Sequence, residues 1–381
     1  MKAVIAIDSF KGSLSSIEAG NAAADGVRRV FKNADVKVFP VADGGEGTVD
    51  ALSEGLGGYK KTVTVSDPLG RKISAQLGIV GKTAIIEMAS AAGITLLKKD
   101  ELNPMFTTTY GVGEMIKAAI ECGCRDFIIG IGGSATNDGG VGMLQALGFE
   151  ILDKNGRQVG FGASGVAEIC AILDRYSLPE LKECTFNIAC DVGNPLCGDN
   201  GCSKIFAPQK GANEEMICKM DESLLKYAEL VKKFNPIVDI NCPGTGAAGG
   251  LGFAFLSFLN SKLQKGIDLV LGATEIENEI KSADFVITGE GRLDSQSIMG
   301  KAPSGVAKIA KKYNKPVLAF AGSVTKDAGL CNFHGIDAFF PIVRGITTLE
   351  EAMEKEKAYQ NLQDSVEQAV RLIKVYYGKE N

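Results

Sequence analysis

Short apolar runs alternate with amphipathic stretches at both ends of the chain. Residues 2–7 (KAVIAI) are apolar throughout, which is typical of a parallel strand covered on both faces. The spacing predicts a helix from about Ser15 to Phe31, and residues 36–42 (VKVFPVA) repeat the strand. From about residue 266 the same alternation continues toward the C-terminus, where a final helix is expected from about Leu349 to Tyr377. The pattern predicts a parallel α/β architecture with six strand–helix units at the two chain ends.

The middle of the chain follows a different rhythm. Residues 62–89 are rich in β-branched residues and are interrupted by the turn signal Pro68–Gly70, so an antiparallel patch is expected there. A long helix is expected over 213–234. Short crossovers favour joining the two chain ends into one sheet. We therefore predict two α/β domains: a discontinuous Rossmann- or flavodoxin-like parallel-sheet domain (1–70 and 268–381) and an inserted mixed α/β domain (71–267).

The composition of the chain argues against a nucleic-acid-binding protein and against a membrane protein. The 381 residues include 41 Lys+Arg and 46 Asp+Glu, a net charge of −5 that gives no strong attraction for nucleic-acid phosphates. No run approaches the about 18 apolar residues of a membrane span, and no signal peptide is recognisable. The ten cysteines suggest reduced thiols in a cytoplasmic protein without nucleic-acid or membrane partners. The sequence leaves the oligomeric state open, with a homodimer among the alternatives.

Four loops that follow predicted strands of the chain ends combine carboxylates, cations and glycines. In open α/β sheets, ligands bind beyond the carboxyl ends of the strands, so these loops are expected to meet at one edge. Carboxylates with a few cations suit a magnesium-bound polyphosphate, although polar loop residues also cap helices. The charged residues concerned are Asp8, Lys11, Asp43, Glu46, Glu290, Arg292, Asp294 and Lys326.

Two glycine-rich loops in the middle segment would present backbone N–H groups to phosphate. Residues 130–135 (GIGGSA) follow an apolar strand, and residues 244–249 (GTGAAG) precede a helix. Both match dinucleotide-binding spacing, and Glu150 follows the first loop at the right distance for a ribose ligand. An NAD-dependent oxidoreductase acting on a small hydroxy acid is therefore an alternative. Glu150, however, lies in a predicted hairpin rather than after a second parallel strand.

Other nucleotide and hydrolase signatures are missing. No segment satisfies the Walker A pattern, and His334 is the only histidine, within a predicted surface turn. Hydrolytic triads and histidine-ligated metals are thus disfavoured, and a general base should be a carboxylate. Asp191 leaves a buried strand into a glycine–proline loop, which would hold its carboxylate rigidly. Lys210 lies near a helix start, where the helix dipole disfavours a positive charge unless an anion is nearby, so a functional role for Lys210 is favoured.

Nine motifs follow one another along the chain: DSFKGS (8–13), ADGGEGT (42–48), DPLGR (67–71), GIGGSATNDGG (130–140), GMLQALG (142–148), CDVGNPL (190–196), APQKGA (207–212), PGTGAAGGLG (243–252) and GEGRLDSQS (289–297). Together they resemble the motifs of the bacterial glycerate kinase family, and the resemblance runs from about residue 2 to residue 377. That resemblance implies two α/β domains with the active site in the cleft between them, and transfer of the ATP γ-phosphoryl group to D-glycerate with Mg²⁺. The product would be 2-phosphoglycerate rather than 3-phosphoglycerate.

Roles follow for individual residues. Asp191 is the predicted general base, and Asp8 is the alternative. Lys11 is the third predicted catalytic residue. Substrate would be bound by Lys11, Arg71, Ser9 and Lys210, and Mg²⁺ by Asp43, Glu46 and Asp294. The nucleotide and its phosphates would meet Gly132, Gly133, Ser134, Asn137, Gly244, Gly246, Gly249, Glu290 and Arg292. Besides the oxidoreductase, a non-catalytic small-molecule binding protein remains an alternative.

Overall fold

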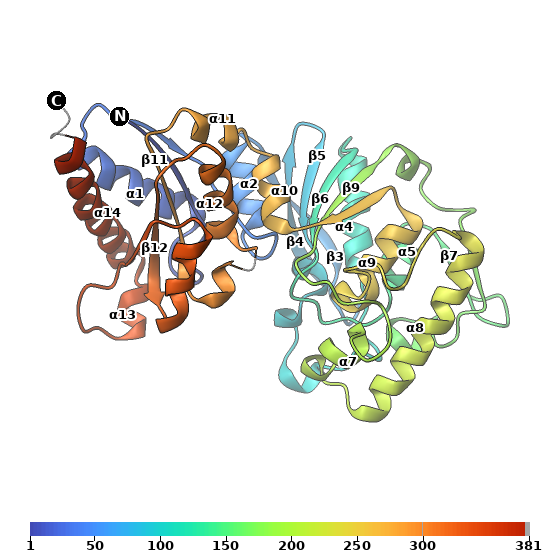
Figure 1. Ribbon diagram of the computed structural model, residues 1–381. Coiled ribbons are helices and arrows are strands. Elements are labelled where there is room, and N and C mark those ends of the chain that lie inside the picture. Colours follow the sequence, from blue (N-terminus) through green and yellow to red (C-terminus); the bar gives the residue numbers. More distant parts are fainter. Residues whose placement is uncertain (299, 378–381) are drawn as a thin grey trace. The chain divides into compact units, whose positions relative to one another are not determined.

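The computed structural model describes residues 1–298 and 300–377, and contacts among them divide the chain into two compact units (Figure 1). The first unit consists of residues 1–43, 50–57 and 267–381, and the second of residues 44–49 and 58–266. The predicted α/β class is confirmed, with one parallel and one mixed sheet. The structure describes no helix long and apolar enough to cross a membrane.

The first unit contains a five-stranded sheet in which all neighbouring strands are parallel. Counted along the chain, the strand order is 2-1-3-4-5, a doubly wound order whose direction reverses between β1 and β11. The expectation of six strand–helix units is wrong for the described residues. The strands, in spatial order, are β13 (Ala338–Pro341), β12 (Val317–Val324), β11 (Phe285–Leu293), β1 (Lys2–Ile7) and β2 (Asp35–Val38).

Helices α1 (Ser16–Val30) and α14 (Lys355–Tyr377) pack on one face of this sheet, over a core that includes Ile5 and Phe285. The α1 start is fixed by a capping box between Ser15 and Glu18. Helix α12 (Ala302–Lys312) contacts β1 and β11. The other helices of this unit are α2 (Thr48–Gly55, which begins in the second unit), α10 (Gly266–Gly272, which begins at the last residue of the second unit), α11 (Ile276–Lys281) and α13 (Leu349–Met353).

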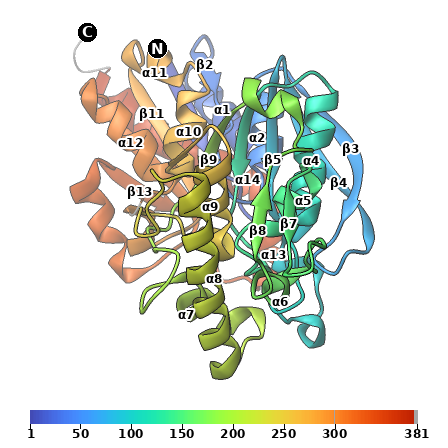
Figure 2. The same ribbon diagram turned by 90° about the vertical axis from the view of Figure 1, so that its right-hand side faces the viewer.

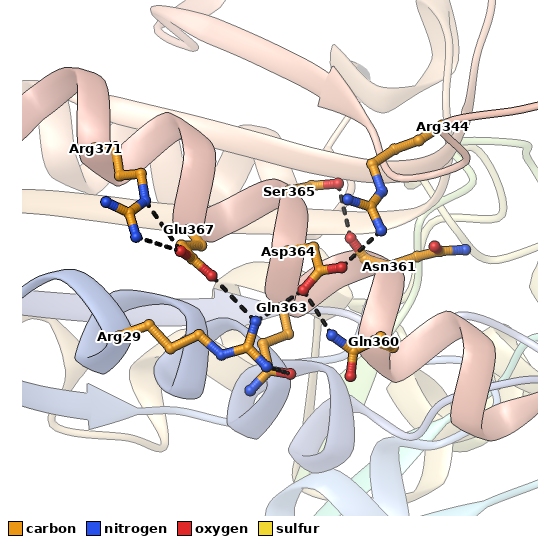
Figure 3. Close-up of polar contacts among 9 residues, drawn as sticks. All are labelled: Arg29, Arg344, Gln360, Asn361, Gln363, Asp364, Ser365, Glu367 and Arg371. Atoms are coloured by element: carbon orange, nitrogen blue, oxygen red, sulfur yellow. Dashed lines mark hydrogen bonds and ion pairs between the residues drawn. The ribbon is translucent and has the colours of Figure 1, made fainter.

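Polar contacts join α1 to α14 at the surface (Figure 3). The Arg29 guanidinium donates to Asp364 at 2.8 Å, to Glu367 at 3.1 Å and to Gln363 at 2.7 Å. Beneath them the two backbones approach closely, because a Cβ on Gly26 would lie 2.5 Å from the Gln363 carbonyl oxygen. The first and last helices of the chain are thereby fixed to each other.

Two predicted boundaries of the first unit differ from the structure. Strand β2 ends at Val38 instead of residue 42, since Pro40 lacks the N–H that a further ladder bond would need. The helix expected from Leu349 to Tyr377 is broken at Glu354, which ends α13 with non-helical backbone angles.

The second unit contains a six-stranded mixed sheet with the predicted antiparallel patch at one edge (Figure 2). Strand β3 belongs to this sheet, although it precedes residue 70. In spatial order the strands are β10 (Ser261–Gln264), β9 (Thr185–Ala189), β6 (Asp126–Gly130), β5 (Thr83–Glu87), β4 (Lys72–Val80) and β3 (Tyr59–Ser66); β7 (Glu150–Leu152) and β8 (Ala171–Leu173) pair separately.

The second unit buries a large core between this sheet and its helices, with Phe127 stacked on Phe186 at 4.7 Å between ring centroids. Its helices are α3 (Ala89–Ala92), α4 (Tyr110–Glu121), α5 (Val141–Ala146), α6 (Gly162–Val166), α7 (Cys202–Phe206), α8 (Glu214–Phe234) and α9 (Ala247–Phe258). Short 3₁₀ helices in the chain span Ile94–Leu96, Lys99–Glu101, Pro179–Glu183, Pro208–Lys210, Ser295–Ile298 and Lys326–His334.

Candidate active site

A cavity of about 600 Å³ opens at the carboxyl ends of β1, β11, β12 and β13, and all of its lining residues belong to the first unit. It includes the point where the strand order reverses, which is where doubly wound sheets bind ligands. Seven residues predicted as site residues line this one cavity: Asp8, Ser9, Lys11, Asp43, Glu290, Arg292 and Asp294.

Asp8 directly follows β1, and only 7% of it is exposed. Its carboxylate accepts the N–H of Ser9 at 2.6 Å. Burial raises the pKa of Asp8 to about 7, repulsion from Asp43 and Glu290 adds to the rise, and Lys11 opposes it. A carboxyl group with a pKa near neutrality is suited to exchange a proton with a bound hydroxyl.

Glu290 lies on β11, also in the cavity wall. Burial raises the pKa of Glu290 and the Asp294 carboxylate adds to the rise, whereas Ser297 and Lys301 lower it. One carboxylate oxygen lies 3.5 Å from the Lys301 ammonium. The other, Oε1, is buried without a hydrogen-bond partner in the described part of the chain. Such an orphaned acceptor requires a partner that the described residues themselves do not supply.

The carboxylates of this cavity fit a magnesium-bound ligand. Repulsion of the Asp8 carboxylate by Asp43 and by Glu290, together with the orphaned Glu290 oxygen, favours a cation near these groups. No three acidic, His or Cys side chains among the described residues form a complete metal-binding group. Mg²⁺ takes one or two protein carboxylates and completes its shell with phosphate oxygens and water. Glu46, the third predicted metal ligand, is exposed in the second unit.

Lys210 belongs to the second unit and is 1% exposed. Its ammonium donates to the Ser134 hydroxyl at 2.8 Å and to the Thr136 carbonyl at 2.6 Å. Burial lowers the pKa of Lys210 to about 8, partly opposed by the nearby Cys202 and Asp138. These contacts hold the loop after β6, where Asn137 is also buried and donates to Ser203 at 2.9 Å.

The two glycine-rich loops of the second unit pack on each other and on neighbouring backbone. The Gly139 N–H donates to the Gly249 carbonyl at 2.9 Å, and a Cβ on Gly249 would lie 2.1 Å from the Thr136 carbonyl oxygen. A Cβ on Gly246 would lie 2.2 Å from the Pro195 carbonyl oxygen, and Gly244 has a φ of +89°. By contrast, Gly132 and Gly133 are exposed, and their backbone is accessible to a ligand.

Asp191 and Arg71 also lie in the second unit. Asp191 is exposed and accepts the N–H of Gly266 at 3.1 Å. Arg71 donates through Nε to Asp67 at 2.5 Å and through Nη1 to Glu101 at 2.6 Å. Two carboxylates thus already engage the guanidinium that was expected to bind substrate.

Several cavity residues were not predicted from the sequence. Lys301 lies just before α12, and Ser323 lies on β12. Thr347, Thr348 and α13 supply a further wall. Polar and cationic residues around a predicted strand end could have flagged Lys301 and Ser323. No pattern in the chain identifies α13, which reaches the cavity through tertiary packing.

Glu150, the residue on which a dinucleotide site would depend, forms an ion pair with Arg175 at 2.9 Å on the surface. Comparison with known proteins decides between the alternatives. The model of the glycerate kinase family matches residues 3–374. The chain belongs to the glycerate kinase family. It is therefore a kinase, a phosphotransferase with an alcohol group as acceptor.

Glycerate kinases of several bacteria are similar over nearly their whole length. The glycerate 2-kinase of Escherichia coli K12 is 50% identical over 364 residues, which covers 95% of each chain. The glycerate kinase of Haemophilus influenzae is 46% identical and covers 98% of this chain and 99% of its own. A crystal structure of a provisionally named glycerate kinase 2 from Salmonella typhimurium LT2 superposes with a TM-score of 0.92 at 42% identity, covering 100% of both chains.

Proposed function

We propose that the protein transfers the γ-phosphoryl group of Mg²⁺-bound ATP to the 2-hydroxyl of D-glycerate, giving 2-phosphoglycerate and ADP. Family membership supports glycerate as the acceptor. The name of the Escherichia coli relative, a glycerate 2-kinase at 50% identity, supports the 2-hydroxyl over the 3-hydroxyl. The observation that carries the mechanism is the buried Asp8 carboxylate among cations and further carboxylates in one cavity.

The chemical step needs a base, an aligned hydroxyl and compensation of phosphate charge. Asp8 accepts the hydroxyl proton while the hydroxyl oxygen bonds to the γ-phosphorus and the bond to the β–γ bridging oxygen breaks. Lys11 and Lys301 offset negative charge at the same cavity. The pKa of about 7 supports Asp8, because the carboxylate is then basic enough to take a proton at neutral pH. Asp191 remains the other candidate for the base.

Asp43 and Asp294, both cavity residues, would hold Mg²⁺, with Glu290 beside them. When bound, Mg²⁺ would neutralise charge on the β- and γ-phosphates. The exposed N–H groups of Gly132 and Gly133 remain candidates for phosphate, whereas the packed Gly246 and Gly249 support the loop from behind. Lys210 supports the same loop through Ser134 and Thr136.

The test is a coupled assay of ADP release with D-glycerate, followed by phosphorus NMR of the product. We expect ADP release that requires both D-glycerate and Mg²⁺, and the resonance of 2-phosphoglycerate. A product with the 3-phosphate resonance would overturn the choice of hydroxyl alone. Thermal stabilisation by glycerate without turnover would favour a binding protein instead. Reduction of added NAD⁺, followed by absorbance, would favour an oxidoreductase.

The active site in a cleft between two domains stays a prediction. Closure of such a cleft would exclude water and prevent wasteful hydrolysis of ATP. Small-angle scattering with and without both substrates tests it, since closure should lower the radius of gyration. An unchanged curve on saturation with D-glycerate and a non-hydrolysable ATP analogue would contradict the prediction.

A further inference from the structure

The cavity of the first unit is much larger than a three-carbon acid requires. Its volume of about 600 Å³ lies in the range in which proteins bind ligands of nucleotide or drug size. Three strand spacings separate β1 from β13 across β11 and β12, which places the two ends of the cavity about 14 Å apart. A nucleoside triphosphate can span this length, whereas glycerate cannot.

The two ends of the cavity differ in chemistry. Asp8, Lys11 and Glu290 are at the β1–β11 end, with further charged residues nearby. Beyond β13 and on α13, the lining side chains are mainly apolar, and the polar exceptions are Thr347 and Thr348 just before α13. This apolar recess is formed by Ile342, Val343, Leu349, Ala352 and Met353. The chemical division matches that of a nucleotide, in which a flat base is separated from the charged phosphates by a sugar.

The apolar recess is built against the loop that carries Asp8 and Lys11. A Cβ on Gly12 would lie 2.7 Å from the Met353 methyl carbon, so α13 packs on that loop. The Thr348 hydroxyl caps α13 by accepting the N–H of Glu351 at 3.2 Å. Lys355, just after α13, forms an ion pair with Glu18 on α1. Leu349 lines the cavity yet is 77% exposed, so its apolar surface is available to a ligand.

We infer that the apolar recess takes the purine base of the ATP used in the proposed function, with the polyphosphate running along the strand ends toward Asp8 and Lys11. Leu349, Ala352 and Met353 would then determine affinity for the nucleoside. The polyphosphate would contact the charged end of the cavity, at Asp8, Lys11 and Glu290, and not the apolar recess. Burial of apolar side-chain surface by the base supplies the binding energy in the recess. This inference rests on the proposed function for the identity of the nucleotide.

The test compares ATP with inorganic tripolyphosphate, which has the charged part of the ligand but no base. Their dissociation constants are measured by calorimetry with Mg²⁺ and no glycerate. In Ala352→Phe the new ring fills the recess, so ATP should bind about tenfold or more weakly, with tripolyphosphate changed less than about twofold. Glu350→Phe adds the same ring to an exposed α13 position outside the cavity lining, and should bind both ligands like the parent protein.

A second variant allows the inference to be tested even if Ala352→Phe does not fold. Leu349 is largely exposed, so Leu349→Ala leaves the core intact and should weaken ATP several-fold, again without affecting tripolyphosphate. Unchanged ATP affinity in both variants, or equal weakening of ATP and tripolyphosphate, would overturn the inference. Because binding is measured without turnover, a parent protein that binds ATP but does not phosphorylate glycerate would contradict the proposed function and leave the inference standing.

Discussion

The Asp8 N–H donates to the Gly289 carbonyl at 2.9 Å, which sets Asp8 beside Glu290 on the next parallel strand. Both carboxylates line the same cavity, and each is largely buried. Repulsion between them contributes to the raised pKa of Asp8. The carboxylate that we propose as the proton acceptor thus lies next to Glu290, and this placement follows from the register of β1 and β11.

Asp8→Asn should lower kcat by about 10²–10⁴, the usual contribution of a positioned general base, with little change in fold. In the parent protein, kcat/KM for ATP should fall as the pH drops through about 7, because the base is then protonated in the free enzyme. The variant should lose this acidic limb. Initial rates across that pH range, with circular dichroism as a check on folding, provide the measurement. An unchanged acidic limb in the variant would assign it to another group.

Asp191→Asn separates the two candidates for the general base. Asp191 is exposed, and its carboxylate accepts a backbone N–H from Gly266, which an amide oxygen can also accept. We expect kcat to change less than about tenfold, well below the loss in Asp8→Asn. A steady-state comparison of the two variants at saturating substrates decides the matter. If Asp191→Asn loses the larger factor, Asp191 is the base, as the loop pattern had suggested.

The strand-end loops could be predicted because the carboxyl ends of parallel strands share one edge, which is why Asp8, Asp43 and Glu290 line one cavity. Burial could not be predicted for single residues in loops. Lys210 has the sequence context of an anion ligand, but its ammonium is enclosed by the loop after β6. Gly249 reads as a phosphate-binding glycine, whereas the structure needs it for close backbone packing on Thr136. These distinctions depend on tertiary contacts that local patterns do not encode.

The buried Lys210 should make stability depend on pH in the alkaline range. Its pKa is lowered from 10.5 to about 8, so between these values the unfolded chain binds more protons than the folded one. The free energy of unfolding should therefore rise with pH across this window through the contribution of Lys210. Lys210→Met removes the titrating group, and shared titrations cancel in the difference between the proteins. Urea unfolding of both proteins near pH 8 and pH 10 measures this difference. If the free energy of unfolding of Lys210→Met changes with pH as much as that of the parent protein, the prediction is contradicted.

Asp138→Asn should destabilise the second unit strongly. The Asp138 carboxylate is fully buried and accepts the N–H and hydroxyl of Thr109, each at 2.8 Å, and the N–H groups of Gly140 at 3.1 Å and Gly142 at 3.2 Å. An amide has one acceptor oxygen, and its NH₂ would face donors. The loss of these charged hydrogen bonds should lower the free energy of unfolding by about 2–3 kcal/mol.

Asp153→Asn is the matched control for this variant. Asp153 also accepts two backbone N–H groups, from Asn155 at 2.8 Å and Arg157 at 2.9 Å, but it does so in a surface turn where water can replace either bond. Urea unfolding of the two variants should thus show a large loss for Asp138→Asn and a small one for Asp153→Asn. Equal losses would mean that the number of accepted hydrogen bonds, rather than the burial of the carboxylate between the starts of α4 and α5, determines the cost.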